Sequence, residues 1–93
     1  MEIFRLLDSC SNGAYKNQLS RSSLSVASNL AAGYAREAGK DRIRFLVIAK
    51  GSCAECWTQL LIGSEARLVE AERAASLAAE AEEVAAMIGG LIK

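Results

Sequence analysis

The chain has 93 residues, 52% of them apolar and none of them proline, and its 11 basic and 11 acidic residues leave no net charge. This length allows one small domain over residues 1–93, and the apolar content excludes a disordered chain. Abundant Ala, Leu and Glu without proline predict an all-α fold. Histidine is absent, which excludes an ordinary Ser-His-Asp triad.

The first predicted element is a short helix over about residues 2–8, followed by the turn-like segment SCSNG. The start of the chain lacks a basic stretch followed by an apolar core, so we expect no signal peptide. No uncharged apolar run reaches the roughly 18 residues of a membrane span. We therefore expect a cytoplasmic protein with no membrane partner, in which the three cysteines are reduced thiols.

The second helix is predicted over about residues 14–37, with Gly39 as its stop signal. Five residues recur at helical spacing and form one stripe along this helix. Several of their side chains are small, which lets two helix backbones approach closely. The members of the stripe are Leu19, Ser23, Val26, Leu30 and Gly33. Ser28 and Asn29 match no nucleophile motif, so we expect structural roles for both. We expect a structural role for Gly33 as well, as a member of the stripe.

The stretch IRFLVIAKGSCAECWTQLL supports two interpretations. The first is a buried strand that leads into a redox C-x-x-C motif, and the second is a single helix over about residues 41–65. We favour the helix because no other segment alternates with the period of two that partner strands require. That helix is apolar nearly all round, so it needs covering neighbours, and in so short a chain we expect them from another subunit.

The last helix is predicted over about residues 69–92, with an apolar stripe on one side and glutamates off it. The stripe consists of Leu77, Ala81, Val84, Ile88 and Leu91.

Candidate chemical groups in the third helix have simpler structural explanations. Cys53 and Cys56 would lie in mid-helix, away from the helix terminus that activates a catalytic thiol, and no further ligands complete a metal site. Trp57 fits a core or an interface. Glu55 lacks a partner for acid-base catalysis and is predicted to form a structural ion pair, with Arg21 preferred over Arg44. We predict no catalytic residue, metal or cofactor.

The charges are unevenly distributed along the chain. Residues 1–50 hold eight Lys/Arg against four Asp/Glu, and residues 51–93 hold three against seven. We expect mutual neutralisation between packed helices to account for this pattern. A basic set near the corner between the second and third helices could also contact phosphates, and the alternative is a solvated charged loop. With a further arginine on the second helix, the candidates are Arg21, Arg36, Lys40, Arg42 and Arg44.

Two blocks, QLSRSSLSVASNLAAGYAR and KDRIRFLVIAKGSCAECWTQLLI, resemble the small bacterial four-helix-bundle family of rRNA intervening-sequence proteins. Matching positions include Asn29, Gly33 and Glu55, whereas Ala27 and Ala32 depart from the family pattern and the first helix is shorter. The resemblance implies a helix across the C-x-x-C segment. It implies an antiparallel up-and-down four-helix bundle with a shortened first helix and three long helices, assembled into a ring.

The same resemblance implies a homo-oligomer, most simply a pentamer, whose biological process is unassigned. Some members are encoded within insertions in large-subunit rRNA genes, and a related bundle protein assists a reverse transcriptase. Two functions are therefore compared below. One is a non-enzymatic scaffold that binds structured RNA or DNA through a basic surface, and the other is a protein-protein interaction scaffold with no nucleic-acid role. Neither requires a small-molecule substrate.

Overall fold

The computed structural model describes residues 2–36 and 39–92, and within these ranges it contains α-helices and no strand. The helices are α1 (Ile3–Leu7), α2 (Gly13–Tyr34), α3 (Lys40–Glu65) and α4 (Ala71–Ile92). The all-α prediction is therefore confirmed. The C-x-x-C segment lies inside α3, so the strand interpretation is wrong.

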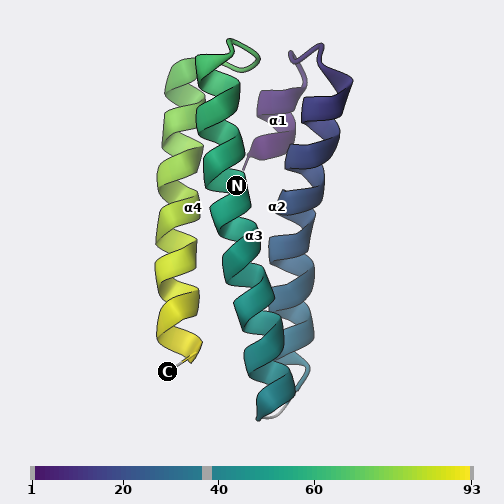
Figure 1. Ribbon diagram of the computed structural model, residues 1–93, viewed down its shortest axis with the longest axis vertical. Helices are drawn as coiled ribbons and strands as arrows, with labels where there is room; N and C mark the ends of the chain where they lie inside the picture. Colours follow the sequence, from purple (N-terminus) through teal and green to yellow (C-terminus); the bar gives the residue numbers. More distant parts are fainter. Residues whose placement is uncertain (1, 37–38, 93) are drawn as a thin grey trace.

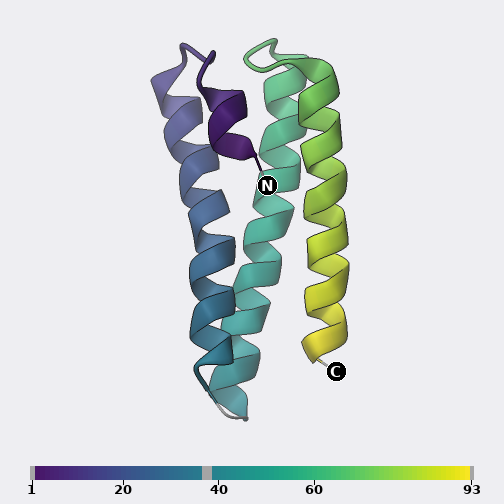
Figure 2. The ribbon, with the colours of Figure 1, turned by 180° about the vertical axis from the view of Figure 1, so that it is seen from behind.

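The three long helices form a flat layer with α3 in the middle (Figure 1). Successive long helices run in opposite directions, and the described chain measures 42 × 21 × 16 Å. The outer helices α2 and α4 pack along α3, but within the described residues they do not pack against each other. The stub α1 lies on one face of the layer, near the end where α2 begins, and touches both outer helices (Figure 2).

The core lies between these elements and consists of aliphatic side chains and the three cysteines. All three core-facing side chains of α1, namely Ile3, Leu6 and Leu7, are buried, although the helix has only five residues. The stripe of α4 is confirmed at Leu77, Ala81 and Ile88, which are buried, and at the half-buried Val84. Leu91 was expected in this stripe, but it is 51% exposed in the last turn of α4.

The starts of α2 and α4 are set by side-chain caps that the sequence patterns did not locate. The Asn12 side chain accepts a hydrogen bond from the Tyr15 backbone N–H at 2.9 Å and starts α2. The Glu70 carboxylate accepts from the N–H groups of Glu72 and Arg73 at 3.1 and 2.7 Å, so α4 starts at Ala71 rather than Val69. These bonds stabilise the ionised carboxylate and lower the pKa of Glu70.

The small-residue stripe of α2 brings its backbone close to α3. A Cβ on the buried Gly33 would lie 3.4 Å from Leu46 Cδ2, which is van der Waals contact, so Gly33 packs directly against α3. About two turns before Gly33 on α2, the hydroxyls of Ser25 in α2 and Ser52 in α3 are 2.7 Å apart. Asn29 Nδ2 donates to Ser25 Oγ at 3.1 Å. The structure thus places Gly33 and Asn29 at the helix contact.

Two features of α2 differ from expectation. Ser28 is exposed and takes no part in the α2–α3 contact, so its structural role stays a prediction. Helix α2 ends at Tyr34, before the expected residue 37, which itself lies outside the described ranges.

Candidate nucleic-acid interface

A compact group of arginines and aromatic rings lies where α2 ends and α3 begins. Tyr34 is the last residue of α2, and the Arg42 guanidinium lies over its ring, 5.7 Å from the centroid. One helical turn further into α3, the Phe45 ring is approached by Arg36 at 4.5 Å and by Arg44 at 5.3 Å. These distances are those of cation–π contacts, which fix a guanidinium against a ring. We call these five residues the basic corner.

Arg36 is held at a second point as well. Its Nη1 donates to the backbone carbonyl of Ala32 at 3.1 Å, one turn back along α2. This carbonyl belongs to the end of the helix, where backbone acceptors lack helical partners and the dipole favours a positive charge. The guanidinium therefore keeps a defined position although its side chain is exposed.

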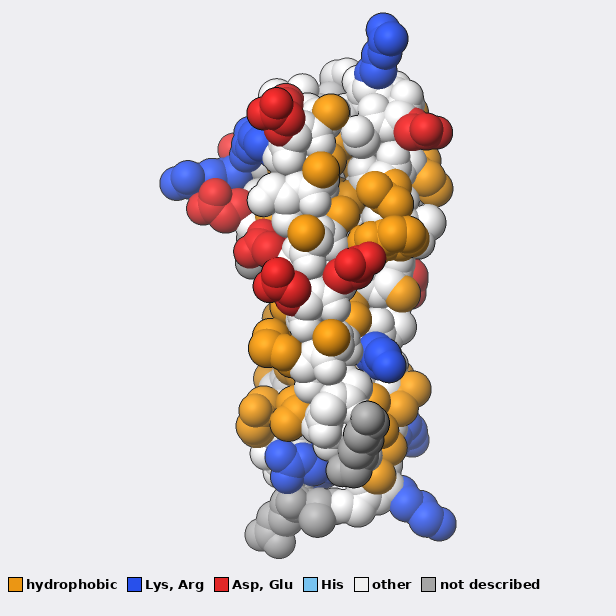
Figure 3. Space-filling view, turned by 90° about the vertical axis from the view of Figure 1, so that its left-hand side faces the viewer, with side chains coloured by type: hydrophobic (Ala, Val, Ile, Leu, Met, Phe, Trp, Pro, Cys, Tyr) orange, Lys and Arg blue, Asp and Glu red, His pale blue; other side chains and the backbone are white. Residues whose placement is uncertain are grey.

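The charge of this end of the molecule is mainly positive. Lys40 opens α3 beside the basic corner, and Lys50 lies further along the same helix. Asp41 is the acidic residue in the first turn of α3, and Glu37 lies outside the described ranges. In the view onto the α4 side, most acidic side chains gather in the upper half and basic ones reach the lower end (Figure 3). The fold thus separates charge along its length, whereas the sequence favoured neutralisation between packed helices.

Arg21 does not belong to this group. It precedes Tyr34 by 13 residues of continuous helix, which corresponds to about 20 Å. The structure therefore brings together Arg36, Lys40, Arg42 and Arg44 at one end of the chain and leaves Arg21 near the middle of α2.

Arg21 instead lines a polar groove of about 390 Å³ between α2 and α3. Glu55 lines the same groove, with Gln18, Ser22, Ser25 and Ser52. Both charged side chains are exposed, and the structure has no ion pair between them. The buried Glu55–Arg21 pair expected from the sequence is therefore not formed within the chain. The physical reason is that both side chains line an open groove and are exposed to solvent, so neither charge is buried against the other.

The uncovered side of α3 is largely apolar. Trp57 is 37% exposed and borders an apolar hollow of about 250 Å³ between α3 and α4, with Ala54, Ala81 and Ala85 among its lining. Beside Trp57, exposed apolar residues of α3 recur at helical spacing and form a stripe. We call this stripe the outer face of α3, and its members are Ile43, Val47, Ala54 and Leu61.

The cysteines are positioned for packing and not for reaction. Cys53 and Cys56 are fully buried in the core. Burial raises the pKa of both thiols, and that of Cys56 reaches about 11, because the buried thiolate loses its hydration. Among the described residues no group of His, Cys, Asp or Glu could hold a metal ion.

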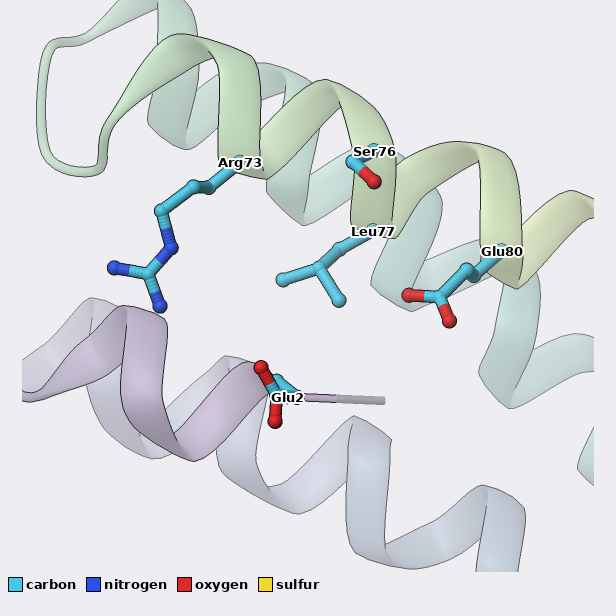
Figure 4. Close-up of a pocket in the computed structure, with 5 residues that line it drawn as sticks. All are labelled: Glu2, Arg73, Ser76, Leu77 and Glu80. Carbon is cyan, nitrogen blue, oxygen red and sulfur yellow. The ribbon is translucent and has the colours of Figure 1, made fainter.

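A second hollow, of about 340 Å³, lies between the start of α1 and the side of α4 (Figure 4). Arg73, Ser76, Leu77 and Glu80 of α4 face Glu2 across it. Glu2 forms an ion pair with Arg5 at 3.6 Å, and both side chains are exposed, so this contact contributes little. The lining is chemically mixed and contains no nucleophile with an adjacent base, so we assign it no chemistry.

By length and composition, α3 could cross a membrane, and it is the one described helix of which this is true. The core helix of a soluble protein satisfies the same test. Helix α3 also carries Lys50 and Glu55 near its middle, and its Cys53 face is buried against its neighbours. We therefore treat α3 as the central packing helix.

These features define a small all-α protein with a short first helix, a central apolar helix and one basic end. The sequence model of the 23S rRNA-intervening sequence protein family matches residues 1–90, and the chain belongs to this family. The family resemblance predicted from the two sequence blocks is thus confirmed. No curated protein matches the chain.

The aromatic rings of Tyr34 and Phe45, over which the arginines lie, were not predicted as part of the site. The segments YAR and RIRF carry a signal that could have found them, since each holds one aromatic residue within three positions of an arginine.

Proposed function

We propose that this protein is a non-enzymatic, self-associating helical scaffold that binds structured RNA or DNA through the basic corner. The observation that carries the proposal is the fixing of Arg36 and Arg44 over Phe45 and of Arg42 over Tyr34 at one end of the chain. Held guanidinium groups meet phosphate oxygens with little further loss of side-chain freedom. Phosphate contacts supply most of the affinity of nonspecific nucleic-acid binding.

Self-association is supported by the outer face of α3. Val47 is 52% exposed and Ile43 is 44% exposed, and Leu61 continues the same stripe. Large apolar side chains gathered on one helix face are typical of an interface between subunits. A closed ring, most simply a pentamer as the family resemblance implies, would cover this face and repeat the basic corner around an axis. The proposal includes a cytoplasmic location, in keeping with three free cysteines.

Mobility-shift titrations with a structured RNA across a salt series test the nucleic-acid part. Each phosphate contact adds roughly 0.7–0.9 to the slope of log affinity against log salt. Changing Arg36 and Arg42 together to Gln should therefore lower the magnitude of that slope by between one and two. It should also weaken the binding of every RNA probe, whatever its nucleotide sequence. The matched control is Arg67→Gln, in the exposed turn at the opposite end of α3. Equal losses from both variants, or no binding by the parent, would refute a site at the corner.

The alternative function is a protein-protein interaction scaffold without nucleic acid, and the exposed outer face of α3 favours it. Light scattering of the parent and of Val47→Glu separates this face from the basic corner. A charge on a subunit interface should shift the mass to that of a single chain. A monomeric parent at micromolar concentration would remove self-association from the proposal.

A further inference from the structure

We infer that the basic corner recognises unpaired nucleotides, by stacking their bases on Tyr34 and on the guanidinium planes beside it. This inference rests on the proposed function and specifies its ligand class. The shared chemistry is an unpaired nucleobase on a phosphodiester strand, which RNA loops, bulges and single-stranded DNA all supply.

Tyr34 is the first part of the argument. Its side chain is 67% exposed, the largest exposed fraction among the large apolar and aromatic side chains of the described chain. It lies at the very end of α2, and Arg42 approaches its ring at 5.7 Å. An exposed ring with a cation beside it offers a flat apolar surface and a nearby charge for the phosphate that accompanies a stacked base.

The guanidinium groups are the second part. Arg36 is fixed both by the Ala32 carbonyl and by the Phe45 ring, and Arg44 approaches the same ring from α3. Both arginine side chains remain exposed. A guanidinium plane that is already held against a ring can stack a nucleobase, and unpaired bases are recognised on Arg planes as well as on aromatic side chains.

The shape of this end is the third part. The described chain is only 21 × 16 Å across its two shorter directions. Proteins that recognise double-stranded RNA by shape span about 16 base pairs and successive grooves. The corner of each single chain therefore has room for a few splayed nucleotides, and the single-strand sites of OB folds begin at about four nucleotides. Phe45 and Tyr34 would have no stacking role against a paired duplex, whose bases are already stacked.

Fluorescence anisotropy with labelled probes of one length tests the inference. The probes are an unstructured RNA strand, its DNA counterpart, the duplex of that RNA with its complement, and an abasic strand that keeps the phosphates and lacks the bases. We expect at least one of the two single strands to bind at least tenfold more tightly than the duplex and the abasic strand. Tyr34→Leu should weaken binding of that strand by roughly 5- to 150-fold, the range that corresponds to one stacked base.

Tyr34→Phe is the matched control, because it keeps the ring and should keep the affinity. Tyr34→Leu should leave binding of the abasic strand unchanged, whereas loss of a phosphate contact would weaken every probe alike. Equal binding of single strands, abasic strand and duplex by the parent would overturn the inference and keep the corner as a phosphate site. Absence of binding to all four probes would overturn the proposed function as well.

Discussion

Replacing Gly63 by alanine should destabilise the protein, although alanine is the better helix former. Gly63 is buried near the end of α3, against the ring of Tyr15 from α2. A Cβ at this position would overlap the Tyr15 hydroxyl and Cζ and lie 2.9 Å from Cε1, all atoms of one rigid ring. The Tyr15 hydroxyl also donates to the Gln59 carbonyl at 2.7 Å, so the ring cannot move without losing that bond.

The size of the effect follows from three terms. Overpacking of a filled contact costs about 1–3 kcal/mol. Loss of the Tyr15–Gln59 hydrogen bond costs about 0.5–1.5 kcal/mol. Alanine in place of glycine in a helix returns about 1 kcal/mol. We therefore expect the free energy of unfolding to fall by about 2 kcal/mol, which lowers the Tm of a chain of this size by about 10 °C.

Urea unfolding followed by far-UV circular dichroism measures this difference, at one fixed protein concentration because self-association would contribute to stability. Gly51→Ala is the matched control in the same helix, since no atom lies within 4 Å of a Cβ there, and it should stabilise by up to about 1 kcal/mol. Adding Tyr15→Leu should remove most of the penalty of Gly63→Ala. If Gly63→Ala proves as stable as Gly51→Ala, the close packing of Tyr15 on α3 is refuted.

Three further outcomes are expected. Burial raises the pKa of Tyr15 to about 12, so the neutral phenol stabilises the fold fully below its ordinary pKa near 10, and this stability is lost as pH rises through 12. Urea midpoints should therefore fall less over that range in Tyr15→Phe than in the parent. Glu55→Gln should change the free energy of unfolding by at most about 0.5 kcal/mol, because the side chain is exposed. A loss above about 2 kcal/mol would instead support a buried ion pair of Glu55. Iodoacetamide should alkylate Cys56 slowly at pH 7 until urea is added, and rapid native labelling would contradict its burial.

The sequence was most informative where one face of a helix is apolar and the other polar. Such a pattern fixes the buried side of a helix, and it placed Leu19, Val26, Leu77 and Ile88 in the core. The family resemblance then decided between strand and helix for the C-x-x-C segment.

Helix α3 shows why the remainder was not predictable. Its apolar residues surround the axis, so periodicity could not tell which half the two neighbouring helices would cover. The wrong expectation for Glu55 follows directly from that ambiguity. The contacts of Phe45 with Arg36 depend on where α2 ends relative to the start of α3, and the helix end is set by local geometry that a hydrophobic pattern does not encode.

The short α1 also has a consequence for the order of folding. Helices α2 and α3, and then α3 and α4, are neighbours in the chain, so their pairing closes only short loops and should be fast. Helix α1 has five residues, too few to form a stable helix before it docks, and its contact with α4 joins distant parts of the chain. It should therefore dock last and open first. In native-state hydrogen exchange, the amides of Leu6 and Cys10, which donate to the carbonyls of Glu2 and Leu7, should lose protection through a local opening that leaves the central turns of α3 intact.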